Sequence, residues 1–161
     1  MRVPADAIAA IRAHGASVYP DECCGALIGQ ESRPSPSASA RLVGATDLPS
    51  GRGGGGRVVE AFALPNTTSG ERRRRFLIGP EEYRAAEARA SEIGSDVIGF
   101  YHSHPDHPAI PSAFDLEHAW PNLSYVIVSV RAGRPEEARS WRLRGDRSAF
   151  DEEALVVESA G

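Results

Sequence analysis

Asp96-Val-Ile-Gly-Phe-Tyr-His-Ser-His-Pro105 and, after six intervening residues, Ser112-Ala-Phe-Asp115 are the two segments that decide the fold. The first segment is apolar and rich in β-forming residues, and we predict a strand over 96–101 that leads directly into His102. His102 and His104 are two residues apart at the end of this strand, so both imidazoles project to the same side of it. Two neutral imidazoles aimed in one direction form half of a zinc site.

A helix is predicted to begin near Ser112 and to end by Trp120. Ser112 and Asp115 are three positions apart, which places their side chains on one face of the first turn. Asp115 can then complete a His₂Asp ligand set and leave the fourth tetrahedral position to water, as in catalytic zinc sites. The same spacing also describes a capping box without any metal. The two histidines upstream favour the metal interpretation.

Three further residues are candidates for roles near this site. His107 and His118 lie outside the ligand spacing, and we expect them at the surface or beside the site rather than on the metal. A zinc site needs a base for its water, and the chain has no HExxH motif to supply one. Glu22, immediately before an apolar strand, is the candidate base. An exposed loop residue would have the same sequence surroundings, so the residues alone leave the role of Glu22 open.

The remaining elements follow from hydrophobic periodicity and from the positions of Pro and Gly. We predict helices over 4–14 and 80–93, and strands over 24–29, 41–46, 57–64, 123–130 and 139–144. Strands mixed irregularly with two or three helices indicate an α/β (α+β) fold. The 161 residues are expected to form a single domain, 1–161, with flexible Gly-, Ser- and Pro-rich loops near 31–40 and 49–57.

The basic residues exclude several classes of function. All 18 are arginines, so enzymes that need a lysine ammonium are excluded, including Schiff-base enzymes, P-loop NTPases and kinases. The formal net charge of −4 argues against a surface built for nucleic acid. Gly51-x-Gly53-x-x-Gly56 has the spacing of a dinucleotide-binding loop, but a strand-like run follows it instead of a helix. We therefore interpret it as a hairpin loop.

The two cysteines and the first residues bear on the cellular compartment. Cys23 and Cys24 are adjacent, and neighbouring cysteines cannot form an ordinary structural disulfide or a CxxC motif. Residues Met1–Asp6 contain no apolar signal core, and no segment approaches the ~18 apolar residues of a membrane span. We therefore expect a cytoplasmic protein that binds no membrane. The sequence assigns no role to either cysteine.

A run of four arginines stands out in this acidic chain. It is either a solvated surface or a docking site for an acidic protein surface, and it is weak evidence for nucleic-acid binding. We retain its members as candidate substrate-binding residues: Arg72, Arg73, Arg74 and Arg75.

The residues singled out above resemble the JAMM (MPN-plus) zinc metalloproteases, most closely their small single-domain prokaryotic members. Pro20-x-Glu22-x-Cys24-Gly25, followed by His-Ser-His-Pro-x₆-Ser-x-x-Asp, carries the resemblance. It continues at Asn66, Arg75–Pro80, Tyr125–Ser129, Trp141 and Phe150–Glu153, and so covers nearly the whole chain. It implies a curved mixed β-sheet clasped by two to three helices, with a layering similar to that of cytidine deaminases.

The resemblance also implies a role for each residue of the site. One Zn²⁺ per chain would be held by His102, His104 and Asp115. Glu22 would be the general base that takes a proton from the attacking water and delivers it to the leaving amine. Ser112 would donate a hydrogen bond to the oxyanion of the tetrahedral intermediate. Inactive scaffold relatives lose ligands, whereas this sequence retains the full set.

The expected partner also comes from the resemblance. Relatives cut the peptide or isopeptide bond after the C-terminal glycine of ubiquitin-like or sulfur-carrier proteins, so a small ubiquitin-fold carrier is the expected substrate. The sequence does not decide between cysteine, a lysine side chain and a longer peptide as the leaving group, nor does it give the oligomeric state. The Gly-, Ser- and Pro-rich character of 31–57 departs from the family pattern.

Two alternatives lie outside the peptidase interpretation. A non-catalytic MPN scaffold would be expected to lack Glu22 or a ligand. The RadC-like, DNA-associated proteins share part of the histidine pattern, but they usually have His-Asn-His and an N-terminal DNA-binding helical domain.

Overall fold

The structure is a computed structural model that describes residues 1–32 and 55–159. In chain order the elements are β1 (Arg2–Pro4), α1 (Ala5–Val18), β2 (Cys24–Gln30), β3 (Arg57–Leu64), α2 (Pro80–Glu92), β4 (Asp96–Pro105), α3 (Ala113–His118), β5 (Ser124–Arg131), β6 (Arg134–Leu143), β7 (Phe150–Glu153) and β8 (Val156–Glu158). None of the described helices is long and apolar enough to cross a membrane.

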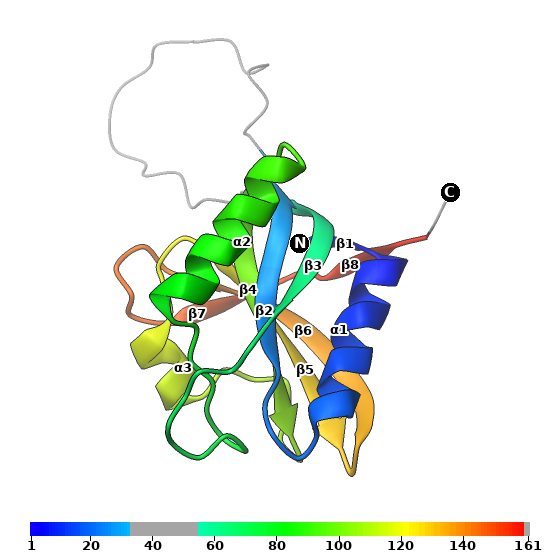
Figure 1. The fold of residues 1–161 in the computed structure, drawn as a ribbon, viewed down its shortest axis with the longest axis vertical. Coiled ribbons are helices and arrows are strands. Elements are labelled where there is room, and N and C mark those ends of the chain that lie inside the picture. The colour runs from blue at the N-terminus through cyan, green and yellow to red at the C-terminus, as the bar shows by residue number, and fades with distance from the viewer. Residues whose placement is uncertain (33–54, 160–161) are drawn as a thin grey trace, which may run out of the picture.

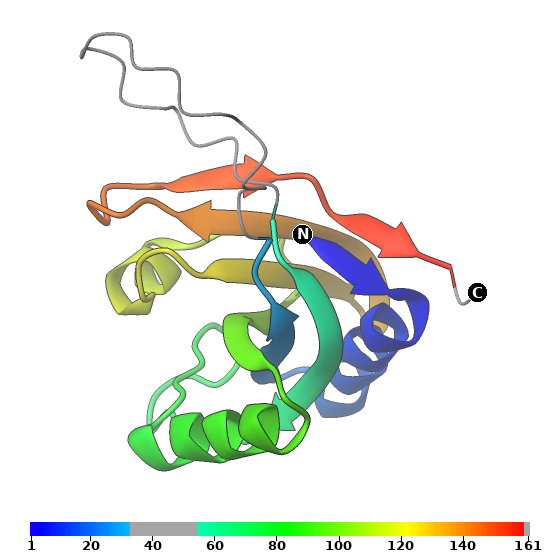
Figure 2. The same cartoon turned by 90° about the horizontal axis from the view of Figure 1, so that it is seen from above.

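The strands described form one mixed sheet in the order β7-β6-β5-β4-β2-β3-β1-β8. The sheet is strongly curved, and helices clasp it (Figures 1 and 2). α1 packs on one face through Ile8 and Ile11, and α2 packs on the other through Ala86 and Ala90. The fold class predicted from the sequence, a curved mixed sheet of the α+β kind with two to three helices, is confirmed.

Successive side chains of the central strands alternate between these two cores. Leu27 of β2 and Tyr101 of β4 belong to the core under α1. Ile28 of β2 and Phe100 of β4 belong to the core under α2. Because side chains two apart on a strand share a face, His102 continues the row begun by Phe100. The alternation of side chains along β4 thus points both histidines to the face of the sheet that α2 and α3 cover.

β4 is an inner strand, and this position makes it a stable platform. It pairs antiparallel with β2, where Cys24 lies opposite His102, and parallel with β5, where Ser129 lies opposite His104. β4 thus has ladder partners on both sides as far as His102, and the β5 ladder continues past His104 to Pro105. The sheet therefore holds the two histidines rigidly.

The predicted helix over 4–14 is wrong at its end. α1 continues to Val18, and Gly15, which we took as a stop signal, lies buried inside it. A Cβ at Gly15 would lie 3.0 Å from Val130 Cγ2 and 3.3 Å from Ser103 Cβ. Glycine is therefore needed here for close packing of the helix on the sheet rather than for helix termination.

The other predicted elements agree with the structure to different degrees. The strand over 57–64 and the helix starting at residue 80 are confirmed, and the strand predicted to end at 101 continues to Pro105. The strand predicted over 139–144 begins earlier, at Arg134. The predicted strand over 41–46 and most of the predicted loops near 31–40 and 49–57 lie outside the described residues.

Candidate metal and catalytic site

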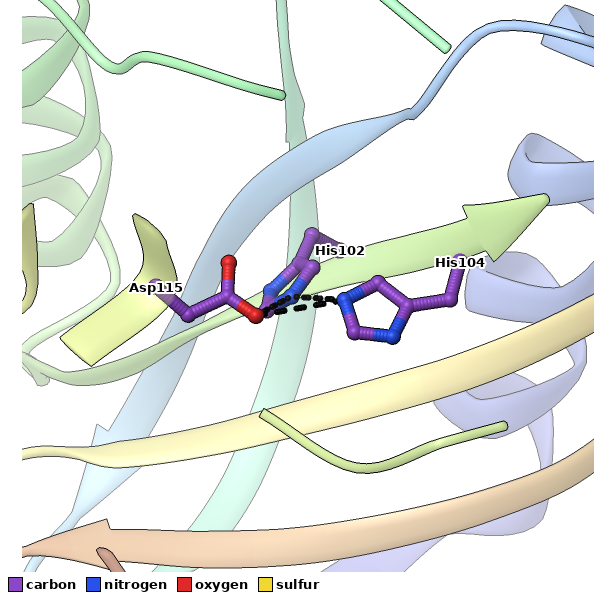
Figure 3. Close-up of side chains that lie close together, drawn as sticks. All are labelled: His102, His104 and Asp115. Carbon is purple, nitrogen blue, oxygen red and sulfur yellow. Dashed lines mark hydrogen bonds and ion pairs between the residues drawn. The ribbon is translucent and has the colours of Figure 1, made fainter. Parts of the chain in front are cut away.

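Three buried side chains from two elements converge on one point. His102 and His104 come from the end of β4, and Asp115 comes from the first turn of α3 (Figure 3). Their facing atoms form a triangle: Nε2 to Nε2 of the histidines is 3.1 Å, His104 Nε2 to Asp115 Oδ2 is 3.2 Å, and His102 Nε2 to Asp115 Oδ2 is 3.3 Å. Among the residues that the structure describes, this is the one group of His, Cys, Asp and Glu close enough to share a metal ion.

The triangle has the size that a tetrahedral ion requires. With Zn–N and Zn–O bonds of about 2.0–2.1 Å, two ligand atoms of a tetrahedral site are separated by roughly 3.3 Å. His104 Nδ1 lies 2.8 Å from the carbonyl oxygen of Pro108, and a carbonyl only accepts, so Nδ1 carries the proton. In neutral His104 the Nε2 lone pair then faces the Asp115 carboxylate, an arrangement that calls for a cation between them. The residues fit a divalent metal.

Burial favours the ligand form of His102. The side chain is fully buried, and its ring stacks on Phe76 with centroids 4.4 Å apart. Desolvation lowers the pKa of His102 more than the neighbouring Asp115 raises it. For His104, burial also lowers the pKa, but the hydrogen bond and charge of Asp115, the charge of Glu22 and the hydrogen bond to Pro108 together leave the pKa raised. The surroundings of His102 thus favour its neutral form. Those of His104 favour a positive charge at its ring.

Asp115 belongs both to the triangle and to a capping box. The Ser112 hydroxyl accepts from Asp115 N–H at 3.1 Å, and Asp115 Oδ2 accepts from Ser112 N–H at 2.7 Å. Burial would raise the pKa of Asp115, but His102 and His104 lower it well below its ordinary value. The two interpretations of Ser112 and Asp115 therefore do not exclude each other: the capping box is present, and it orients the carboxylate toward the histidines.

Glu22 lies beside this group and is buried. It lines a cavity of about 380 Å³ together with His104 and Ser112. Desolvation raises the pKa of Glu22 to about 8, against the opposing effect of His104. Its Oε2 has no hydrogen-bond partner among the described residues. A buried carboxyl group with an unpaired oxygen, next to a candidate metal site, has the surroundings of a general acid–base group rather than those of an exposed loop residue.

The backbone around Glu22 is fixed by long-range hydrogen bonds. The N–H of Cys23 donates to the Ser103 hydroxyl at 2.8 Å, and Ser103 N–H donates to the Cys23 carbonyl at 3.1 Å. Asn66 Nδ2 donates to the Glu22 carbonyl at 3.2 Å, and Glu22 N–H donates to the Arg72 carbonyl at 2.7 Å. Ser103, which lies between the two histidines in sequence, thus connects β4 to the segment that carries Glu22. Sequence reasoning missed this role.

The loop between the histidines and α3 is held from three sides. Tyr19 donates to Asp106 Oδ2 at 2.8 Å, Ser129 donates to the His107 carbonyl at 2.7 Å, and Trp141 Nε1 donates to the Ala109 carbonyl at 2.9 Å. Two of these acceptors are main-chain carbonyls, which no side-chain pattern can reveal. Together the contacts fix the path of the chain from His104 to Ser112.

The other candidates occupy different positions. His107 lines the cavity but lies outside the triangle. His118 is exposed, and its ring stacks on Phe114. Arg74 lines the cavity with Glu22, Arg73 lines a neighbouring one, and Arg75 lies over the Phe114 ring at 5.1 Å. The four arginines are exposed but do not act as one uniform patch.

Fold and site together define a class: a curved mixed sheet with a His–His–Asp group that could bind a metal, next to a buried carboxylic acid, as expected of a metal-dependent hydrolase. The sequence model of the family described as prokaryotic homologs of the JAB domain (Prok-JAB) matches residues 4–144. The chain therefore belongs to this JAB/MPN family, as the resemblance predicted.

Two relatives with assigned names are hydrolases. The CysO-cysteine peptidase of Mycobacterium tuberculosis is 30% identical over 158 residues, which cover 97% of this chain and 90% of the relative. The desampylase of Haloferax volcanii is 38% identical over 74 residues, 45% of this chain. That match spans 53% of the desampylase, about half of its length.

Two solved structures have the same fold. A protein from Salinibacter ruber is 43% identical with a TM-score of 0.69, and the match covers 98% of this chain and 92% of that one. A JAB1/MPN domain protein from Archaeoglobus fulgidus is 21% identical with a TM-score of 0.55, covering 98% of this chain and 100% of that one, and it supports the fold alone.

Proposed function

We propose that the protein is a zinc-dependent peptidase or isopeptidase that hydrolyses the bond after the C-terminal glycine of a ubiquitin-like or sulfur-carrier protein. The observation that carries the proposal is the triangle of His102, His104 and Asp115 beside the buried Glu22. The names of the relatives, CysO-cysteine peptidase and desampylase, support the hydrolase class and the kind of substrate.

His102, His104 and Asp115 would hold the zinc, with two nitrogen donors and one oxygen donor. When bound, zinc lowers the pKa of a coordinated water toward about 7 and polarises the scissile carbonyl. The open fourth position distinguishes such a catalytic site from a structural one. The capping box at Ser112 keeps Asp115 in its orientation before the ion arrives.

Glu22 would act as the general base and then as the general acid. Its carboxylate takes a proton from the attacking water and delivers it to the leaving amine, a contribution of roughly 10²–10⁴-fold. Burial excludes bulk water from Glu22 and leaves one carboxyl oxygen without a protein partner, available for this proton. The hydrogen bonds of Cys23 and Asn66 keep the carboxyl group at its place beside the cavity.

Ser112 would stabilise the oxyanion. A hydroxyl has one proton to donate and two lone pairs. Since its oxygen accepts from Asp115 N–H, the Ser112 proton is still available for a hydrogen bond to the developing negative charge. The capping role and the catalytic role therefore use different parts of the same hydroxyl group.

The carrier tail would enter extended. Glycines allow the main chain to approach the metal closely, and main-chain hydrogen bonds supply affinity without large side-chain pockets. The exposed Arg72–Arg75 run lies next to the cavity and would dock an acidic face of the carrier, so binding should weaken as salt rises. Two buried free thiols, Cys23 and Cys24, suit the reducing cytoplasm, which we propose as the site of action.

The test is to incubate the protein with two conjugates of a diglycine-ended carrier such as CysO, one with cysteine and one with a lysine side chain. Intact mass is the readout. Cleavage directly after the terminal glycine is expected, with cysteine as the better leaving group. Cleavage of unrelated unfolded peptides at the same rate would reject carrier specificity, and salt-independent binding would reject the arginine docking alone.

The two alternatives predict other results. A non-catalytic scaffold would bind the carrier without cutting it, but such proteins are expected to lack a ligand or the base, and the candidates for all four are gathered here. A RadC-like protein would associate with DNA. Glu22, Ser112 and the His–His–Asp group together form a complete set of candidate catalytic residues. This set supports the hydrolase over the scaffold and over the RadC-like protein.

A further inference from the structure

One arginine of the Arg72–Arg75 run differs from its neighbours in position. Arg74 lines the same cavity as Glu22, His104 and Ser112. Its side chain is exposed, and none of the described carboxylates forms an ion pair with it. Because a guanidinium stays protonated at any physiological pH, Arg74 brings a permanent positive charge to this cavity.

The segment of Arg74 is not a loose loop. The amide of Asn66 donates to the Glu22 and Arg75 carbonyls at 3.2 and 3.0 Å and accepts from Thr68 and Leu77 N–H, both at 3.1 Å. Arg74 N–H donates to the Glu71 carbonyl at 3.0 Å, closing a turn. The segment that bears Arg74 is thereby fixed to the backbone of the base.

This fixed relation determines which part of a substrate lies near Arg74. The leaving amine must lie at Glu22, because Glu22 gives it a proton. In a conjugate that ends in a single amino acid, one carbon separates that amine from a free α-carboxylate. In a lysine isopeptide, four methylenes separate the amine from the nearest backbone, and no carboxylate is close. Only the first leaving group places a negative charge within reach of a guanidinium beside Glu22.

We infer that Arg74 binds the α-carboxylate of the leaving group and thereby selects conjugates that end in one extra amino acid over lysine isopeptides. The inference rests on the proposed function and assigns the residue that distinguishes its leaving groups. In the reaction, water adds to the carbonyl carbon of the terminal glycine and the C–N bond breaks. The products are a carrier with a free glycine carboxylate and an amino acid with a free amine.

The test uses CysO extended by one cysteine in two forms, the free acid and the α-carboxamide, which have nearly the same size but of which only the acid is charged. For the wild-type protein we expect kcat/KM to favour the acid by about 10- to 100-fold, the range of a hydrogen bond to a charged group. Arg74→Ala should lower kcat/KM for the acid toward the value for the amide, and it should lower kcat/KM for the amide no more than Arg72→Ala does. Cleavage of the amide by this variant also proves that it is folded.

Arg72→Ala is the matched control, since Arg72 belongs to the same run but does not line the cavity. If the run docks the carrier, this variant lowers kcat/KM equally for the acid and the amide, so the ratio of the two values stays the same. Equal cleavage of acid and amide by the wild-type protein overturns the carboxylate site and leaves the proposed function standing. Failure of the wild-type protein to cleave either conjugate overturns both.

Discussion

The hydroxyl of Ser103 accepts a hydrogen bond from the backbone N–H of Cys23 at 2.8 Å, across 80 residues of sequence. Ser103 separates the two histidines of the candidate metal site, and Cys23 follows the candidate base. One buried hydroxyl therefore connects the backbone beside the candidate base directly to the strand that carries the candidate metal ligands.

Removal of this hydroxyl should destabilise the fold. Ser103→Ala leaves the buried Cys23 N–H without its acceptor, and we expect a loss of about 1–3 kcal/mol in the free energy of unfolding by urea titration. Ser124→Ala is the control, because Ser124 Oγ is buried without a partner in the described structure, so its removal should be neutral or stabilising. Equal losses in both variants would contradict the argument.

The zinc content of the protein should depend on the three residues of the triangle, His102, His104 and Asp115. Protein purified without added metal should contain one zinc per chain, and His104→Ala and Asp115→Ala should lose it, as measured by elemental analysis. His118→Ala, which removes an exposed histidine outside the group, should keep it. Since the imidazoles must be neutral to bind, occupancy should fall below about pH 6. Equal zinc in all variants would exclude this site.

Glu22→Gln should separate catalysis from metal binding. Glutamine keeps the shape of the side chain but cannot accept the proton, so we expect zinc and fold to remain and kcat to fall at least ~10²-fold. Asp21→Asn, the neighbouring carboxyl group, is the control and should leave kcat nearly unchanged. Wild-type turnover by Glu22→Gln would mean that Glu22 has no role in proton transfer.

Ser112→Ala should show both functions of the hydroxyl. Loss of the helix cap should cost about 1 kcal/mol of stability. Loss of the oxyanion donor should lower kcat by about 10²–10³-fold, with KM little changed. Urea titration and steady-state kinetics on the same preparation distinguish the two effects. A stability loss without a rate loss would leave Ser112 as a helix cap only.

The raised pKa of Glu22 gives a pH dependence of stability. With the metal removed, folded Glu22 keeps its proton up to about pH 8, whereas the unfolded chain releases it near its ordinary value of 4.5. The unfolded state therefore binds fewer protons between these limits, and wild-type stability falls as pH rises, by at most about 1.4 kcal/mol per pH unit. Relative to Glu22→Gln, the loss should appear between pH 5 and 8. Parallel pH profiles of the two proteins would contradict the assignment.

The grouping of His102, His104 and Asp115 could be predicted from the sequence because its geometry is local. Alternation along one strand aims His102 and His104 to the same side, and helical spacing adds Ser112 to Asp115. Glu22 is different, because its approach depends on the pairing of β2 with β4, where Cys24 lies opposite His102. Periodicity does not specify which strands pair, so the role of Glu22 came from the family resemblance alone.

Other features escaped prediction for equally physical reasons. Val156–Glu158 and Arg2–Pro4 are strands of three residues, too short for alternation to be recognised. The acceptor for His104 is the main-chain carbonyl of Pro108, which carries no sequence signal. Gly15 has the appearance of a helix stop, but its missing side chain serves packing against Val130.

The inner position of β4 has a consequence for local opening of the molecule. An inner strand flanked on both sides exposes its amides only when much of the fold opens, whereas helix starts and connecting segments open at lower free energy. His102 and His104 lie on β4, and Ser112 lies at the start of α3. We therefore expect a bound ion to stay on the two imidazoles while the first turn of α3 opens briefly, so that loss of the metal is slower than local opening at Ser112.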